Sequence, residues 1–280
     1  MDPYKDFTKR FSLLAKKHPD IVTITLSNIF TMRLIGNKTH GDLAEIAIAE
    51  FINQYMYDFT SIHVGKDLYR AKSKEEDITI HNEITNEEFP VSLKAYGDGP
   101  LQLSTDKDFN MFPLLTEYGE EITDKKTIEE IFNSSAFSYF SEINVMPLIY
   151  DEKKQRCNIL VFDSEKAKQR TVKIKLQKGG NGRKHPAFRF YAEDNSYICE
   201  VRYGNAAANA LQRGLWTHTK NALPFFDSLT NGWIDYSHNI VLVKLFSHAL
   251  VSSSAGHTDA LEIVKKDISE LQKKYRLNEK

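Results

Sequence analysis

Apolar and polar residues alternate along two neighbouring segments in the first half of the chain. The first segment, DITIHNEI, covers residues 77–84, and the second, FPVSLKAY, covers residues 89–96, with a short polar break between them. Because side chains on a strand point to opposite faces in turn, this pattern predicts an antiparallel hairpin. Asp77 on one strand and Lys94 on the next can then share one face.

Two segments before this hairpin have apolar residues at helical spacing. The first covers about residues 2–18, where Asp2 is suited to cap the helix. The second, 37–59, predicts an amphipathic helix that packs on the hairpin. Glu45 and Glu50 lie five residues apart on it and so on different faces, which lets only one of them face a site on the hairpin. Solvated surface charges are the alternative for both.

The rest of the chain mixes predicted helices with strands. A short helix starting at Ser104 or Thr105 would offer hydroxyl and N–H groups to a phosphate, although a plain cap is the alternative. A further helix is predicted at about 127–132, strands over 146–151, 156–163, 171–177 and 196–204, and helices over 205–226 and near the C-terminus. The candidate base-reading side chains on the 205–226 helix are Asn209, Gln212 and Arg213. An alanine-rich packing helix is the alternative there.

Basic residues gather in one part of this second half. Nine Lys or Arg residues and no acid occur between Lys166 and Arg189. The 171–177 segment alternates, so two of its lysines share a strand face, and a glycine-rich hairpin tip follows at which a backbone can approach a ligand closely. The pattern favours a nucleic acid, with an exposed sheet face as the alternative. The candidate contacts are Lys173, Lys175, Gln177, Lys178, Gly179, Gly180, Asn181, Gly182, Arg183 and Lys184.

Composition limits the remaining choices. The chain has 280 residues, 41% of them hydrophobic, which suffices for one large or two small domains. Its net charge is −1, so any attraction to nucleic acid must come from local clusters. Two cysteines, Cys157 and Cys199, are too few for a disulfide framework and indicate a reducing compartment. Since no signal peptide or long apolar run is visible, we expect an intracellular soluble protein without membrane contact.

An acid and a lysine on one face of the hairpin suit the hydrolysis of a phosphodiester bond. A carboxylate such as Asp77 can hold a divalent metal that activates water and neutralises developing charge, while Lys94 orients or deprotonates the nucleophile. A solvated pair of charges on neighbouring strands is the alternative.

Three motifs together resemble the PD-(D/E)xK nuclease superfamily, and most closely its type II restriction endonucleases. GDLAE at 41–45 is similar to the Gly-x-x-x-Glu helix of the family. Asp77 followed by Ser92-Leu93-Lys94 is similar to its Asp and (Asp/Glu/Gln)-x-Lys pair. LQKGGNGRKHPAFRF at 176–190 resembles a Lys-Gly-Gly-x-x-Gly-Arg hairpin of small restriction enzymes. The order and spacing of the three motifs carry the resemblance, because the first two are short.

The resemblance implies a mixed α/β fold with a restriction-endonuclease-like core, in which helices flank a central mixed β-sheet. It implies a single nuclease domain over 1–280. Within it, the catalytic core would cover about 38–104, the DNA-contacting region about 166–220, and a helical packing region about 221–280.

The resemblance also implies an active site. Asp77 would ligate Mg²⁺ together with the backbone carbonyl of Leu93, Lys94 would lie next to the attacking water, and Glu45 would complete the site directly or through water. Ser92 departs from the family, which usually has an acid or an amide there. A serine is a poor Mg²⁺ ligand, so the departure makes Glu45 more important. Nearby acids that can substitute are Glu76 and Glu88.

The expected function is Mg²⁺-dependent, sequence-specific hydrolysis of double-stranded DNA by a type II restriction endonuclease. The resemblance places such an enzyme in the cytoplasm of a prokaryotic cell and pairs it with a DNA methyltransferase, and a homodimer is the default for symmetric sites. One alternative is a non-catalytic nucleic-acid-binding protein with a degenerate nuclease core, which Ser92 favours. Another is a PD-(D/E)xK nuclease of repair or toxin type.

Overall fold

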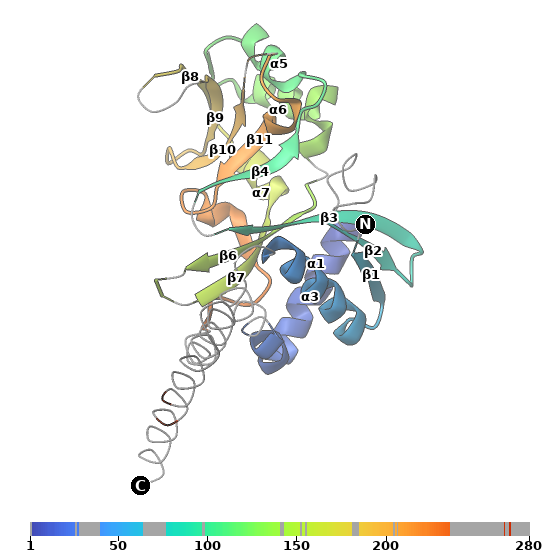
Figure 1. The fold of residues 1–280 in the computed structure, drawn as a ribbon. Coiled ribbons are helices and arrows are strands. Elements are labelled where there is room, and N and C mark those ends of the chain that lie inside the picture. The colour runs from blue at the N-terminus through green and yellow to red at the C-terminus, as the bar shows by residue number, and fades with distance from the viewer. Residues whose placement is uncertain are drawn as a thin grey trace. The chain divides into compact units, whose positions relative to one another are not determined.

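A computed structural model of the chain has a mixed α/β fold with a mixed sheet flanked by helices, in agreement with the predicted fold class (Figure 1). The structure describes residues 2–25, 27, 40–63, 77–96, 99–140, 143–151, 153–154, 156–180, 185–203, 205, 207–235, 266 and 269. The predicted helices near the C-terminus lie outside the described residues except for Lys266 and Ser269, which are helical and exposed.

The larger sheet has the strand order β1-β2-β3-β6-β7-β12, with β13 also paired to β7. Its strands are β1 (Phe59–His63), β2 (Ile78–Asn82), β3 (Glu87–Tyr96), β6 (Val145–Asp151), β7 (Arg156–Phe162), β12 (Phe226–Ser228) and β13 (Ile234–Asp235). Strands β1 and β2 are antiparallel, whereas β3 and β6 are parallel, with Ser92 opposite Val145. The predicted hairpin is confirmed as β2 and β3, which are neighbours joined by a four-residue turn.

The second sheet has the order β4-β11-β10-β9-β8-β5, and its neighbouring strands are antiparallel. Its strands are β4 (Pro100–Thr105), β5 (Glu121–Ile122), β8 (Lys173–Gln177), β9 (Ala187–Tyr191), β10 (Tyr197–Arg202) and β11 (Gly214–His218). The helical elements in the same part of the chain are α5 (Met111–Glu117), α6 (Lys125–Asn133), η1 (Ser135–Phe140) and α7 (Ser164–Arg170). The prediction of a helix at 127–132 is confirmed by α6.

The chain divides into two compact units. The first comprises Met1–Phe89, Tyr150–Asn158 and Thr230–Lys280, and the second comprises Pro90–Ile149 and Ile159–Leu229. The divisions fall within β3, β6 and β7, so each of these strands contributes to both units. The single domain over 1–280 stays a prediction.

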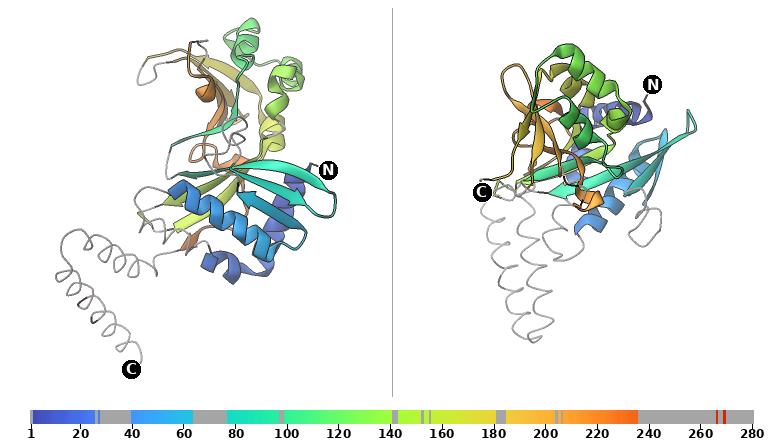
Figure 2. Two further views of the ribbon diagram at one scale, coloured as in Figure 1. Left: turned by 45° about the vertical axis from the view of Figure 1, so that its right-hand side comes forward. Right: turned by 90° about the horizontal axis from the view of Figure 1, so that it is seen from above.

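Helices α1 (Pro3–Lys17) and α3 (His40–Tyr55) form the core of the first unit with β1 and β2, beside which they lie in Figures 1 and 2. Asp2 caps α1 as predicted, since its carboxylate accepts the backbone N–H of Tyr4 at 3.0 Å. Aromatic rings connect the elements. The ring centroid of Phe7 of α1 lies 5.3 Å from that of Phe59 of β1, and the centroids of Phe11 and of Phe51 of α3 are also 5.3 Å apart. These edge and tilted contacts are the favoured geometries for buried rings.

The second unit has its own aromatic core. One face of the antiparallel sheet packs on α5 and α6. There the ring centroids of Phe188 of β9 and Phe112 are 5.0 Å apart, and those of Phe190 and Phe132 are 5.8 Å apart. Both phenylalanines of β9 are buried, while Arg189 and Tyr191 between and after them are partly exposed. The opposite face of β9 therefore carries polar and aromatic side chains.

Two predicted helices are wrong. The 205–226 segment contains two short 3-10 turns, η2 (Ala210–Gln212) and η3 (Leu223–Phe225), on either side of strand β11. Pairing of β11 with both β4 and β10 overrides the helix preference of the alanine-rich sequence. Gly214 allows β11 to start close to β4, because it has φ of +123° and a Cβ at its position would collide with the carbonyl oxygen of Ser104. Ser104 and Thr105 themselves end strand β4 and do not start a helix.

Candidate functional site

The β2–β3 hairpin presents the predicted catalytic side chains on alternating positions. On β3, Val91 and Leu93 are buried, whereas Ser92 and Lys94 are partly exposed and therefore share the face opposite the core. Asp77 directly precedes β2 and is also partly exposed. The alternation predicted from the sequence is confirmed on β3.

The turn of the hairpin is closed by polar contacts. Asn82 accepts the backbone N–H groups of Ile84 and Thr85 on its side-chain oxygen, at 3.0 and 3.2 Å. Beyond it, His81 Nδ1 lies 3.9 Å from Glu88 Oε1 across the two strands. The side chains of His81 and Glu88 therefore approach each other across the hairpin.

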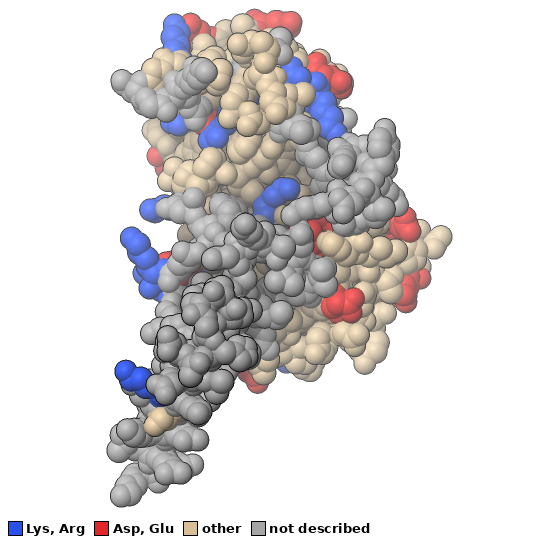
Figure 3. Space-filling view, in the orientation of Figure 1, with Lys and Arg blue, Asp and Glu red and all other residues tan. Residues whose placement is uncertain are grey.

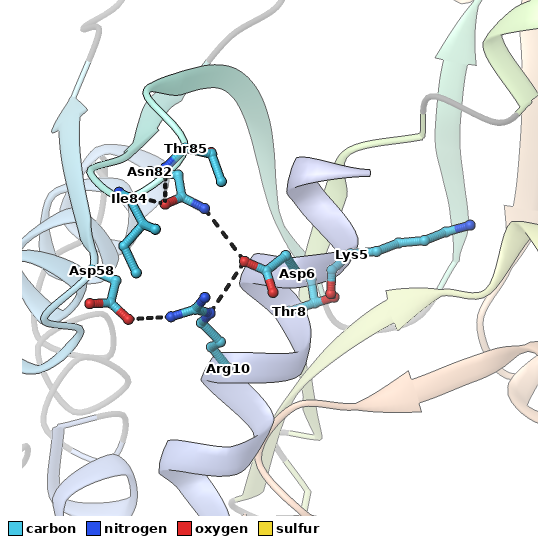
Figure 4. Close-up of polar contacts among 8 residues, drawn as sticks. All are labelled: Lys5, Asp6, Thr8, Arg10, Asp58, Asn82, Ile84 and Thr85. Atoms are coloured by element: carbon cyan, nitrogen blue, oxygen red, sulfur yellow. Dashed lines mark hydrogen bonds and ion pairs between the residues drawn. The ribbon is translucent and has the colours of Figure 1, made fainter. Parts of the chain in front are cut away.

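A second set of contacts ties this turn to α1 (Figure 4). Arg10 pairs with Asp6, at 3.2 Å, and also with Asp58, which precedes β1. Asp6 in turn accepts a hydrogen bond of 3.4 Å from the Asn82 amide. The cluster holds α1, the start of β1 and the hairpin turn in a fixed arrangement, and we assign it a structural role.

Glu45 of α3 is buried, with 7% of its surface exposed, while Glu50 of the same helix is exposed. Oε2 of Glu45 lies 3.1 Å from Nε2 of His63 at the end of β1. His63 pairs with Ile78, the residue that follows Asp77. The structure thus brings Glu45 together with a histidine that the sequence had not singled out, next to the start of β2.

Asp77 supplies one carboxylate, the type of ligand that holds Mg²⁺ in proteins. Mg²⁺ is usually bound by one or two carboxylates and keeps several waters. Within the described ranges, no group of three or more His, Cys, Asp or Glu residues could hold a metal ion. Glu76 lies outside the described residues, and Glu45 is engaged by His63.

The basic segment is less positive in the fold than in the sequence. Lys175 Nζ lies 3.0 Å from Glu121, and Lys178 Nζ lies 2.8 Å from Glu120. In Figure 3, the Lys and Arg atoms of the second unit form separate groups with acidic atoms among them. Local sequence could not reveal these partners, because β5 joins β8 from about fifty residues away.

The two strands of the predicted glycine hairpin are present as β8 and β9. Strands β8 and β9 pair antiparallel, with Gln177 opposite Ala187, and Gly179 and Gly180 are exposed at its start. The remaining candidates of the tip, Asn181, Gly182, Arg183 and Lys184, lie outside the described residues.

The remaining candidates lie in two places: Ser104 and Thr105 end β4, whereas Gln212 ends η2 and Asn209 and Arg213 flank it. Arg213 is only 9% exposed, donates from Nη2 to the carbonyl of Lys107 at 3.0 Å, and lies over the ring of Phe109. It therefore stabilises the fold rather than presenting a free guanidinium. Gln212 and Asn209 are exposed, and Ser104 and Thr105 are partly exposed on the last residues of β4.

The outer face of the second sheet carries a charged cluster that the sequence analysis missed. Glu200 of β10 is 1% exposed and lies directly opposite both Arg189 and Trp216. Its Oε2 accepts from Arg189 Nε at 3.0 Å, and its Oε1 accepts from Nε of Arg202. Burial lowers the pKa of Arg189, but the hydrogen bond and charge of Glu200 outweigh it and hold that pKa above its ordinary value.

Comparison of the chain with protein-family models, curated proteins and solved structures gives no match. No helix among the described residues has the length and apolar character needed to cross a membrane.

Proposed function

We propose that the protein is a type II restriction endonuclease that hydrolyses phosphodiester bonds of double-stranded DNA at specific sequences with Mg²⁺. The observation that carries the proposal is the arrangement of the hairpin. Asp77 stands at the head of β2, and Ser92 and Lys94 alternate with buried residues on β3. A carboxylate that can hold a metal ion and a lysine that can orient the nucleophile are residue types that metal-assisted phosphodiester hydrolysis uses.

Each residue of the hairpin has a distinct role in this proposal. Asp77 and the carbonyl of Leu93 would hold Mg²⁺, which supplies an activated water and neutralises developing charge. Lys94 orients the attacking water, and its ammonium stabilises the charge that develops on the phosphate in the transition state. Ser92 can donate a hydrogen bond but brings no charge.

Glu45 supports the site in one of two ways. Its carboxylate can turn from His63 to the metal, or it can stay on His63 and orient that imidazole toward the start of β2. In the second case Glu45 acts through a histidine and not as a ligand.

The test is digestion of plasmid and phage DNA with Mg²⁺, comparing the wild type with Lys94→Ala. Discrete, reproducible fragments from the wild type alone, abolished by EDTA, are expected. Random degradation would instead indicate a nuclease of repair or toxin type. Lys125→Ala, on the exposed surface of α6, is the matched control and should leave cleavage unchanged.

A second candidate function is a DNA-binding protein with a degenerate nuclease core. Two observations favour it: the serine at position 92, and the engagement of Glu45 by His63. Binding that survives EDTA, with intact DNA at every Mg²⁺ concentration, would establish this function in place of cleavage.

A further inference from the structure

The outer face of the second sheet holds two arginines in a fixed position. We call the cluster of Arg189, Tyr197, Glu200, Arg202 and Trp216 the guanidinium face. Both arginines donate to Glu200 through Nε, and the Arg189 guanidinium also hydrogen-bonds the Tyr191 side chain. The Nη groups of Arg202 are not used by its contact with Glu200. An arginine has five N–H donors, and a planar guanidinium suits the oxygens of a phosphate.

Each of the two guanidinium groups lies over an aromatic ring. The Arg202 guanidinium lies 4.9 Å from the ring centroid of Trp216, and that of Arg189 lies 5.7 Å from Tyr197. Trp216 is fixed in turn, because its Nε1 donates to the carbonyl of Gln212 at 2.9 Å. The arginines cover one face of each ring, so these rings are better suited to orienting cations than to stacking bases.

The neighbouring backbone is also held in an uncommon conformation. Tyr203 follows Arg202 and has φ of +63°, which is unusual for a residue other than glycine. The ring of Tyr203 packs against those of Trp216 and His185, with ring centroids 6.3 and 5.4 Å apart. The aromatic cluster thereby fixes the chain at the end of β10.

Charge on this face favours an anion. Strand alternation places Lys173 and Lys175 of β8 on the same side as Arg189, with Lys175 directly opposite it. These lysines and the two arginines give four cations, against the carboxylates of Glu200 and Glu121. Both arginines retain exposed side-chain surface, 32% for Arg189 and 18% for Arg202.

We propose that the guanidinium face binds phosphates of duplex DNA through Arg189 and Arg202, with Glu200 as the residue that positions them. The choice of DNA as the ligand rests on the proposed function. Phosphate contacts fix the position of a duplex without reading its sequence. The face therefore contributes affinity that depends on salt and is the same for all sequences.

The first test measures binding of a fluorescein-labelled duplex of random sequence, by anisotropy in EDTA, over a range of salt concentrations. Each lost phosphate contact lowers the slope of log K against log salt by about 1. Arg202→Ala and Arg189→Ala should each reduce the slope by that amount. Arg156→Ala is the matched control, because its guanidinium also lies over an indole, 4.3 Å from the Trp233 ring, but in the first unit. Unchanged slopes in folded Arg202→Ala and Arg189→Ala would overturn the proposal.

The second test avoids substitutions on the face itself. The chain has two tryptophans, so Trp233→Phe leaves Trp216 as the only indole emitter. Emission from Trp216 should change with duplex concentration along the same curve as the anisotropy and return when salt is added. Constant Trp216 emission at saturating duplex would contradict contact at Arg202.

The two tests separate this inference from the proposed function. Salt-dependent binding through Arg202 without Mg²⁺-dependent cleavage would sustain the guanidinium face and refute the nuclease. Sequence-specific cleavage with wild-type salt slopes in both arginine variants would sustain the nuclease and refute the guanidinium face.

Discussion

Glu45 and Glu200 are both buried carboxylates, one in each unit, and their surroundings differ. Glu200 lies between two guanidinium groups that stay charged at any physiological pH. Glu45 lies against the imidazole of His63, whose ring nitrogens can each donate or accept a hydrogen bond according to the tautomer. A carboxylate between two permanent cations is suited to a fixed structure, whereas one beside a histidine is suited to changing partners during a reaction.

We assign different tasks to these two regions of the molecule. The surroundings of Glu45 and the β2–β3 hairpin are where we place bond cleavage, and the guanidinium face is where we place sequence-independent affinity. Substitutions in the two regions should therefore affect different measurements.

The largest effect is expected at Lys94. Lys94→Ala should lower the rate constant for cleavage by about 10²–10⁴-fold, the usual contribution of a positioned acid–base group. Single-turnover gel assays with Mg²⁺ measure this rate. Anisotropy in EDTA should give a dissociation constant within about twofold of that of the wild type, a smaller change than the loss of one phosphate contact would cause. A parallel loss of binding would show that Lys94 only holds DNA.

Glu200→Gln should cause the largest loss of stability among the polar substitutions. Removing one partner of a buried ion pair leaves the other uncompensated, at a cost of about 3 kcal/mol in the free energy of unfolding. Urea denaturation measures this cost. Glu129→Gln on the exposed surface of α6 is the control, with an expected cost below about 1 kcal/mol. Equal costs for the two variants would remove the distinction between Glu200 and a surface acid.

Glu45→Gln tests the other half of the comparison. We expect the Mg²⁺ concentration for half-maximal cleavage to rise about 10–100-fold, as for residues that support a metal site from behind its ligands. The loss of stability should be about 1 kcal/mol, the usual value for one hydrogen bond. Titration of cleavage with Mg²⁺ and urea denaturation give the two numbers. An unchanged Mg²⁺ requirement would exclude Glu45 from the site.

The smallest effect is expected in thiol labelling of the native protein. Cys157 lies in the first unit and Cys199 in the second, and both are buried. Burial raises the pKa of Cys157 to about 12 and that of Cys199 well above its ordinary value, so neither forms an appreciable amount of thiolate at pH 8. Neither should react with a thiol reagent until its unit unfolds, and mass spectrometry of labelled peptides would then report each unit separately. Rapid labelling of one cysteine in native buffer would mean that its unit opens readily.

Local patterns in the sequence were sufficient for the parts of the fold that depend on neighbouring residues. The cap at Asp2, the helix around Glu45 and the β2–β3 hairpin follow from periodicity and turn chemistry within short segments. Each of these predictions is confirmed, because the residues that decide it lie close together in the sequence.

Long-range pairing explains what the sequence could not supply. Strand β11 replaces a predicted helix because it fits between β4 and β10, and Glu200 faces its arginines only through the registers of β9 and β10. His63 meets Glu45 only because β1 lies beside α3, across a separation of 18 residues. Side chains that meet through sheet register leave no periodic signal in the sequence.

Single-turnover cleavage of one duplex at rising protein concentrations, for Lys94→Ala and Arg202→Ala beside the wild type, tests this division of tasks most directly. The account predicts that Arg202→Ala reaches the wild-type maximum rate at higher protein concentration, whereas Lys94→Ala stays slow at saturation. A Lys94→Ala variant that cuts at the wild-type rate once saturated, or a wild type that leaves the duplex intact with Mg²⁺, would contradict it.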